Sequence, residues 1–187
     1  MRLSPLGYYA DFFISLALIL GLGATALYPS TLEQSALWAA FFLTGFFLWT
    51  LIEYFVHRVL YHNVPWFESM HDAHHDEPNS FIGAPPIIGV VGILALFFLP
   101  FYFASYLLAS GIASGVLAGY MAYMLIHHAA HFWNVKPSSP LYFLRRHHAL
   151  HHHHHDLGNY GIVTSFWDHV FGTSLEGRRR SPRYELP

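Results

Sequence analysis

The chain has 187 residues, of which 54% are hydrophobic and only 11% are charged. Soluble globular domains carry about 25% charged residues, so this composition excludes an ordinary soluble domain and indicates a membrane protein, with one domain over residues 1–187. A formal net charge of −2 argues against nucleic acid as a partner, and the absence of cysteine excludes disulfides, thiolate zinc sites and cysteine-ligated iron–sulfur clusters.

Apolar stretches of membrane-spanning length follow one another along the chain. Each holds about 20 residues, which as a helix spans the ~30 Å core of a bilayer. Turn residues separate them in pairs, at Pro29-Ser30-Thr31 and at Ser110-Gly111, and such short links favour antiparallel hairpins. The sequence therefore predicts an all-α integral membrane protein with four transmembrane helices in two hairpins: Tyr8–Tyr28, Ser35–Phe55, Pro86–Leu108 and Ile112–His131.

Two local features refine this prediction. Met1–Tyr9 lacks the charged region and cleavage site of a signal peptide in the right order, so we expect the first stretch to be a retained anchor. Pro100 lies inside the third stretch, where we expect it to kink the helix.

The basic residues predict the orientation of the helices. The links after the first and third stretches contain no Lys or Arg. Every basic residue falls on the other side, namely Arg2, Arg58, Lys136, Arg145, Arg146, Arg178, Arg179, Arg180 and Arg183. The positive-inside rule then places both termini, the Val56–Pro85 connection and the tail in the cytoplasm.

Sixteen residues are histidine, and all lie between His57 and His169. The predicted topology brings their clusters to one cytosolic membrane face. Imidazole is the commonest metal ligand, and histidines three or four residues apart share one face of a helix. Ten well-spaced ligands are too many for one ion, so two metals with about five histidines each are expected: His57, His62, His71, His74, His75, His127, His131, His148, His151 and His152.

The spacings differ between clusters. The pattern HxxHH occurs at His71–His75 and at His148–His152, where each motif can give two or three ligands from one patch, and His127 and His131 form an i, i+4 pair. His57 and His62 are five residues apart and cannot easily bind one ion from an unbroken α-helix. Either the helix ends between them or each serves a different metal.

The remaining histidines are less suited to be ligands. His153, His154 and His155 cannot all point one way, His128 and His147 adjoin better-placed partners, and a plain surface role is favoured for the isolated His169. Metal-bound histidines usually donate their second N–H to a carboxylate or carbonyl, so Glu53, Asp72 and Asp168 are candidates to orient ligands. Glu53 is the best placed, since it precedes His57 by four residues.

A transport function is disfavoured by the middle of the apolar stretches. Transporters usually keep charged or histidine side chains at mid-membrane depth. From Phe12 to Ala26, Ala36 to Leu51, Ile87 to Leu108 and Ile112 to Leu125, tyrosine is the only ionisable residue. The chemistry is therefore expected in a helical cap at the cytosolic edge of the bilayer.

These motifs resemble the fatty acid hydroxylase and sterol desaturase superfamily, most closely its fatty acid 2-hydroxylase branch. The likeness covers about residues 49–173: the segment from Trp49 to His62, both HxxHH motifs, HxxxH at His127, the Ala84-Pro85-Pro86 proline pair, and the closing Asn159-Tyr160-Gly161 and Phe166–Thr173 segments. The chain differs in the short gap between His62 and His71, in Met124 where that branch usually has aspartate, and in showing no cytochrome b5 domain.

The resemblance implies a membrane enzyme with a histidine-bound dimetal centre, formed by the ten histidines named above, that uses O₂ to hydroxylate or desaturate a lipid. It implies two iron ions, with zinc able to replace them on purification, and an external electron donor such as a separate reductase, ferredoxin or cytochrome. The expected substrate is a fatty acyl chain, free or within a lipid. Within the superfamily, the alternative substrates are a sterol, a carotenoid or an ether lipid, and the alternative product is an alkene. Outside it, the alternative is a membrane metal-binding or transport protein. The oligomeric state is not indicated.

Overall fold

The computed structural model describes residues 2–83, 86–154 and 157–175, and within them every extended regular element is helical. One isolated antiparallel β-bridge joins Arg2 to Ile82. The helices are α1 (Pro5–Leu27), α2 (Leu32–Phe55), the π-helix η1 (Val56–Tyr61), α3 (Pro65–Asp76), α4 (Pro86–Ile93), the π-helix η2 (Leu94–Phe98), α5 (Leu99–Tyr102), α6 (Tyr106–Phe132), α7 (Pro140–His154) and α8 (Phe166–Val170).

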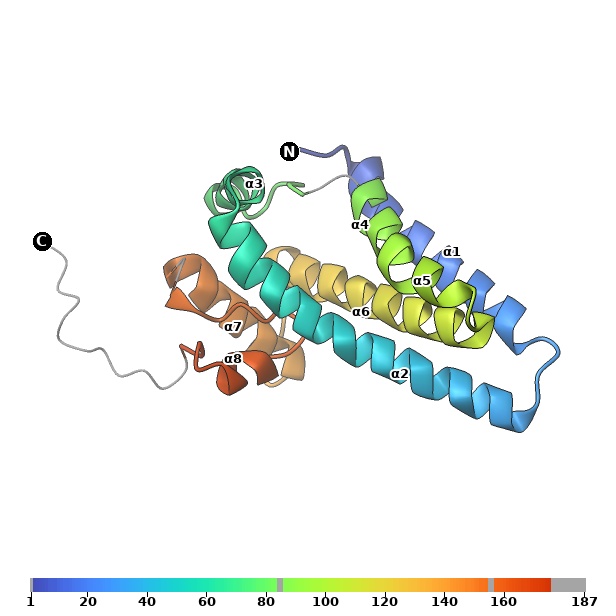
Figure 1. The fold of residues 1–187 in the computed structure, drawn as a ribbon. Coiled ribbons are helices and arrows are strands. Elements are labelled where there is room, and N and C mark those ends of the chain that lie inside the picture. Colours follow the sequence, from blue (N-terminus) through green and yellow to red (C-terminus); the bar gives the residue numbers. More distant parts are fainter. Residues whose placement is uncertain (1, 84–85, 155–156, 176–187) are drawn as a thin grey trace, which may run out of the picture.

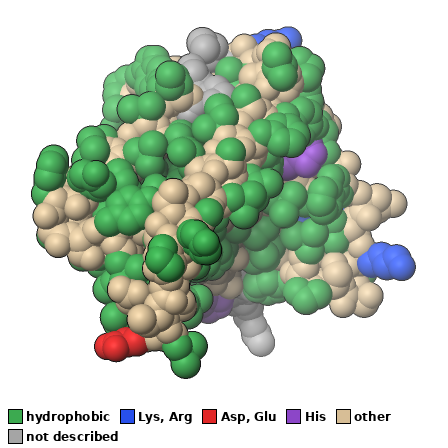
Figure 2. Space-filling model, turned by 90° about the vertical axis from the view of Figure 1, so that its right-hand side faces the viewer, with side chains coloured by type: hydrophobic (Ala, Val, Ile, Leu, Met, Phe, Trp, Pro, Cys, Tyr) green, Lys and Arg blue, Asp and Glu red, His purple; other side chains and the backbone are tan. Residues whose placement is uncertain are grey.

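The long apolar helices form a bundle, and the helices α3, α7 and α8 lie at one end of it (Figure 1). Three helices are long and apolar enough to cross a membrane: Pro5–Leu27, Leu32–Tyr61 and Tyr106–Phe132. Seen from the end at which α1 and α2 are joined, the surface consists largely of hydrophobic side chains (Figure 2). Such a surface suits lipid rather than water, because monomeric soluble proteins rarely expose large continuous apolar patches.

The prediction of four full spans is supported only for three of them. The third apolar stretch forms the shorter helical segment Ile87–Tyr102, which includes η2 and α5. Its π-helical turns directly precede Leu99-Pro100, where proline has no amide to donate to a preceding carbonyl. At about 1.5 Å per residue, its 16 residues reach about 24 Å, less than the ~30 Å of a bilayer core.

The predicted turn at Ser110-Gly111 is wrong. The chain turns instead at Phe103–Ser105, and the Ser105 hydroxyl accepts a hydrogen bond from the amide of Leu108 to begin α6. Ser110 and Gly111 lie inside α6, fully or nearly fully buried, and the indole of Trp38 on α2 donates to the Ser110 hydroxyl. Small residues at these positions serve helix packing, which outweighs their propensity to form turns.

Glycine allows α2 and α6, which run in the same direction, to approach each other closely along their contact. A Cβ atom on Gly115 of α6 would lie 2.0 Å from the Phe42 carbonyl oxygen, and one on Gly45 of α2 would lie 2.3 Å from that of Ile112. Close backbone contact through small residues is a common way for membrane helices to associate, since lipid tails provide no hydrophobic driving force. This contact fixes the position of α6, which carries two of the predicted ligands.

The first turn agrees with the prediction. It occupies Tyr28–Thr31, and α2 begins with a capping box in which the side chains of Thr31 and Gln34 each accept from the other's backbone amide. The helices α1 and α2 therefore form the first predicted hairpin.

Candidate metal centre

The helices bring all ten predicted ligands to one end of the bundle. His57 lies in η1 and His62 directly after it, the first HxxHH motif lies on α3, His127 and His131 lie near the end of α6, and the second HxxHH motif lies on α7. Nine of the ten form two groups whose donor atoms lie within 4.8 Å of one another. We call them cluster 1 (His57, His62, His71 and His151) and cluster 2 (His74, His127, His131, His148 and His152).

His75 joins cluster 1. Its Nε2 lies 3.0 Å from Nε2 of His71 and 3.2 Å from Nε2 of His151. The Nε2 atom of His57 lies 3.2 Å from that of His71 and 2.9 Å from that of His151. Several Nε2 atoms of this cluster therefore converge on a common point.

Cluster 2 has the same short distances between Nε2 atoms. His127 lies 3.0 Å from His74, and His148 lies 2.9 Å from His131 and 3.0 Å from His152. Two nitrogens bound about 2.1 Å from one ion lie about 3.0–3.4 Å apart when the bond angle is between a right angle and the tetrahedral angle. The distances in both clusters fit nitrogens that share an ion.

Each HxxHH motif divides between the clusters. On α3, His71 and His75 belong to cluster 1 and His74 to cluster 2, whereas on α7 His148 and His152 belong to cluster 2 and His151 to cluster 1. Neighbouring residues of a helix point about 100° apart, so they face different ions, while residues four apart share a face. The sequence predicts one patch for each motif, whereas in the structure each motif contributes ligands to both clusters.

The burial of the clusters keeps their imidazoles neutral. Burial, reinforced by the imidazoles of His131 and His75, lowers the pKa of His74 to about 3. Burial also lowers the pKa of His151 to about 3, although the hydrogen bond to the Gly158 carbonyl acts in the opposite direction. Neutral imidazole has the free lone pair that a metal needs. The clusters could each hold a transition metal ion.

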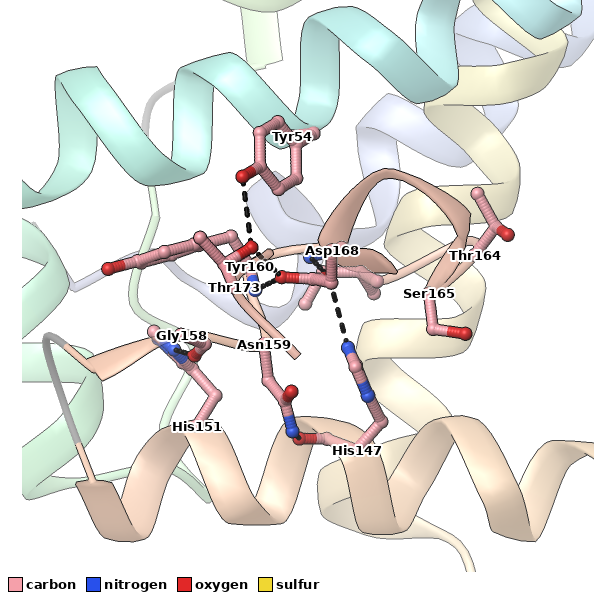
Figure 3. A network of polar contacts seen from close by, with 12 residues as sticks. Tyr54, His147, His151, Gly158, Asn159, Tyr160, Thr164, Ser165, Asp168 and Thr173 are labelled. Atoms are coloured by element: carbon pink, nitrogen blue, oxygen red, sulfur yellow. Dashed lines mark hydrogen bonds and ion pairs between the residues drawn. The ribbon is translucent and has the colours of Figure 1, made fainter. Parts of the chain in front are cut away.

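Backbone carbonyls orient two ligands of cluster 1. His57 donates through Nδ1–H to the Tyr160 carbonyl at 2.6 Å, and His151 donates in the same way to Gly158 at 3.0 Å. A donating Nδ1 leaves Nε2 as the acceptor nitrogen, and Nε2 is the atom that faces the cluster. Figure 3 shows His151 below the loop that carries these carbonyls.

The π-helix resolves the spacing of His57 and His62. Both belong to cluster 1, and the chain does not leave the helix between them, so neither alternative derived from an α-helix holds. A π-helix bonds residue i to i+5, which brings residues five apart onto one face, as residues four apart are in an α-helix. The two rings accordingly stack at a centroid distance of 5.4 Å.

The three candidate carboxylates lie in different surroundings. Glu53 does not bond to His57; its buried carboxylate accepts from the amides of Ile162 and Val163. Asp168 is also buried and accepts from loop amides rather than from a cluster histidine. Asp72 is exposed on α3, and no hydrogen bond from it to a cluster histidine is found among the described residues, so a role in orienting ligands gains no support there.

The other described histidines lie outside both clusters. His147 is buried and bonds to Asp168 at 3.1 Å, and His128 faces the Tyr8 hydroxyl at 3.2 Å. His153 and His154 are exposed. The exposed His169 bonds to the carbonyl of Ser165, the residue before its own short helix. His155 lies outside the described residues.

A cavity of about 50 Å³ adjoins both clusters. Its polar lining includes His57 and His71 from cluster 1 and His74, His127 and His148 from cluster 2. The remaining lining residues were not singled out in the sequence: Tyr61, Met70, Ile82, Gly83, Tyr123 and Ile162. Among them, only Tyr123 could have been selected from the sequence, because it precedes His127 by four residues and so shares its helix face. In the structure its ring stacks on that of His127 at a centroid distance of 5.7 Å.

Comparison with known proteins gives consistent matches. A family model described as fatty acid hydroxylase matches residues 42–173. The human protein named fatty acid 2-hydroxylase is 34% identical over 148 residues, which are 71% of this chain and 38% of that protein. The protein named ceramide very long chain fatty acid hydroxylase scs7 from Schizosaccharomyces pombe is 32% identical over 71% of this chain and 42% of its own length. The chain therefore spans about two fifths of these relatives.

A solved structure is also similar. It is described as full-length scs7p with only the hydroxylase domain visible, and it aligns with a TM-score of 0.75 at 27% sequence identity. The alignment covers 90% of this chain and 67% of that one.

Proposed function

The chain belongs to the fatty acid hydroxylase family, and from that premise we propose that it is a membrane-bound dimetal enzyme that uses O₂ to hydroxylate a fatty acyl chain, either free or linked to a lipid. The observation that carries the proposal is the pair of histidine clusters lining one cavity at the end of an apolar bundle. Such an arrangement suits a reaction between a buried metal centre and a substrate that approaches from lipid.

We assign the ten histidines to two iron ions, five around each, with His75 completing cluster 1. Imidazole donors also suit zinc, which could occupy the sites on purification. Bound iron would supply the activation of O₂ and the attack on an unreactive C–H bond. The chain's own residues hold the ligands in place: the carbonyls of Gly158 and Tyr160 fix two imidazoles, and the π-turn aligns His57 with His62.

The substrate would reach the centre along apolar side chains. The cavity is large enough for a few water-sized molecules but not for a whole acyl chain, so only the reacting segment would enter it. Ile82, Met70 and Ile162 would exclude water from that segment. The clusters lie at the end of the bundle, where the chain would meet the lipid head groups, and relatives are named fatty acid 2-hydroxylases. We therefore propose C2, the carbon beside the acyl carbonyl, as the position attacked.

The proposal includes a partner and an orientation. Hydroxylation with O₂ consumes electrons, and a separate reductase, ferredoxin or cytochrome would deliver them. The basic residues favour a cytoplasmic location for the clusters and both termini, in a multi-pass membrane protein.

The test is an isotope experiment on the full chain in detergent or lipid. Iron-loaded protein with a reductant and ¹⁸O₂ should convert a fatty acid or ceramide to a product that carries one ¹⁸O at C2. Label that came only from H₂¹⁸O, or turnover without O₂, would refute the oxygenase. A product two hydrogens lighter would indicate desaturation, and a sterol, carotenoid or ether-lipid product would change the substrate class. Metal uptake into liposomes without lipid oxidation would instead favour a transport protein.

A further inference from the structure

Two peptide groups of the loop between α7 and α8 receive hydrogen bonds from cluster 1, and their opposite ends are held as well. The Tyr160 carbonyl accepts from His57, and the amide of Gly161, which belongs to the same peptide group, donates to Asp168 Oδ2 at 2.8 Å. A peptide group is a planar conjugated unit, so its carbonyl and its amide cannot reorient independently. Asp168 and His57 therefore hold the two ends of one rigid group.

A second peptide group, between Gly158 and Asn159, is held in a similar way. The Gly158 carbonyl accepts from His151, and the amide of Asn159 in that group donates to the Thr173 carbonyl at 3.0 Å. Thr173 in turn donates to Asp168, from its amide to the backbone carbonyl at 2.8 Å and from its hydroxyl to Oδ1 at 2.7 Å. Figure 3 shows Asp168 beside Tyr160 and Thr173, above His147.

The surroundings of the Asp168 side chain supply hydrogen-bond donors, so it acts only as an acceptor. Its side chain is fully buried, and four donors converge on its two oxygens: the amides of Tyr160 and Gly161, the Thr173 hydroxyl and Nε2 of His147. Burial alone would raise the pKa of Asp168, but these hydrogen bonds outweigh it and the pKa lies below its usual value. The buried group is thus a carboxylate that carries its charge.

We propose that Asp168 is a positioning residue of cluster 1, acting on His57 through the Tyr160–Gly161 peptide group. In many metal sites a carboxylate accepts directly from the ligand histidine, which fixes the ring and makes it a stronger donor. Here a peptide group lies between the two, and hydrogen bonds in such a chain polarise one another. The inference rests on the proposed metal centre.

No equivalent connection is found for cluster 2 among the described residues. In cluster 2, the Nδ1 atoms of His74 and His148 are buried, and neither has a hydrogen-bond partner among the described residues. Loss of the Asp168 charge should therefore weaken one metal site and spare the other.

Asp168→Asn is a sharp probe because it keeps the shape of the side chain. One oxygen becomes an NH₂ group, and that group must face either the amide of Tyr160 or the amide of Gly161, both of which are donors. The hydroxyl of Thr173 and the ring of His147 can adapt by rotation or by a change of tautomer, but a backbone amide cannot. One loop amide is left without an acceptor in either orientation.

The experiment is a Co²⁺ titration of the metal-free full chain in detergent, followed by absorption spectroscopy. The wild-type protein should bind about two equivalents. Asp168→Asn should weaken one equivalent by about 10- to 100-fold, the usual effect of losing an outer hydrogen-bond partner of a ligand, and leave the other within about threefold. Asp11→Asn is the matched control, because Asp11 of α1 is also buried but bonds to Tyr120 of α6 instead of to the loop. It should change neither site.

Two further variants separate the proposal from a general structural role. His147→Gln removes a partner of Asp168 on α7 but leaves the acceptor of Gly161, so it should bind both equivalents normally; equal weakening would overturn the proposal in favour of simple anchoring of α7. In a His57→Ala background, Asp168→Asn should weaken the already weakened site by less than it weakens that site in the wild-type background. Additive effects would also overturn it.

The wild-type protein provides a test that does not depend on whether Asp168→Asn folds. Zinc binding should shift the amide resonance of Gly161 in ¹⁵N-glycine-labelled protein and leave that of Gly21 unchanged, since Gly21 belongs to α1, which lies away from α7 and α8 in Figure 1. An unshifted Gly161 resonance in zinc-loaded protein would count against the connection. A wild-type protein that bound no metal would instead refute the proposed function.

Discussion

His57 and His62 stack with ring centroids 5.4 Å apart, although they are five positions apart in the sequence, because η1 is a π-helix. In a π-helix residue i+5 takes the place that residue i+4 takes in an α-helix. The π-turn is therefore part of the construction of cluster 1.

Because of this relationship, we expect cluster 1 to tolerate the deletion of one residue from η1. Deletion of Val59, a partly exposed residue of η1, should convert the π-turn to an α-turn in which the two histidines are four apart and still share a face. Metal titration should find both sites within about tenfold of wild type. Insertion of one alanine after Val59 should rotate His62 away by about 100° and abolish one site. Equal loss in both variants would contradict this explanation.

Two histidines of α7 form a matched pair for ligand assignment. His151 is fully buried with its Nε2 2.9 Å from that of His57, whereas His154 is exposed one turn further along. His151→Ala should reduce bound metal from about two ions to about one and reduce hydroxylation by more than the 10–100-fold typical of outer partners. His154→Ala should retain both. Metal analysis with a product assay decides, and equal damage would show that the assignment along this run is wrong.

Gly115 and Gly21 offer a comparison of helix packing. Alanine at Gly115 would place Cβ 2.0 Å from the Phe42 carbonyl oxygen, so α2 and α6 must move apart, at a cost of about 1–3 kcal/mol. Alanine at Gly21 of α1 meets nothing within 4 Å and should be neutral or stabilising by about 0.5–1 kcal/mol. Thermal unfolding in detergent measures both. A Gly115→Ala protein as stable as wild type would refute the close contact.

Acid should destabilise the metal-free protein. The folded state keeps the pKa of His74 and His151 at about 3, below the ordinary value of 6.5, so the unfolded chain binds protons that the folded chain refuses. The free energy of unfolding should therefore be constant above about pH 7 and fall as the pH drops from about 6.5 towards 3. Denaturant titrations at several pH values test this. Stability that rose on acidification would mean that the clusters are not buried and neutral.

The orientation can be tested with reporters in the turn at Ser30 and after His75. The positive-inside rule predicts that the first lies outside the cytoplasm and the second inside. A reporter at Pro187, which lies outside the described residues, is expected in the cytoplasm as well. Labelling by a membrane-impermeant reagent distinguishes the sides, and a reporter after His75 on the same side as Ser30 would refute the orientation.

The sequence by itself determined the membrane character and the choice of the ten clustered histidines. Both follow from local physics: apolar stretches of bilayer length exclude a soluble domain, and imidazoles three or four residues apart share a helix face. Helix parity then predicted that clusters separated by up to about ninety residues would meet at one end, as the structure shows.

Only the tertiary structure decided which histidine belongs to which cluster. His74 and His75 are neighbours in sequence yet lie in different clusters, because the angle between their side chains matters only once α6 and α7 are in place. The same holds for Asp168, whose contact with the Tyr160–Gly161 peptide group arises when α8 folds back onto the loop. Periodicity describes one helix at a time, whereas these relationships depend on where several helices and a loop meet.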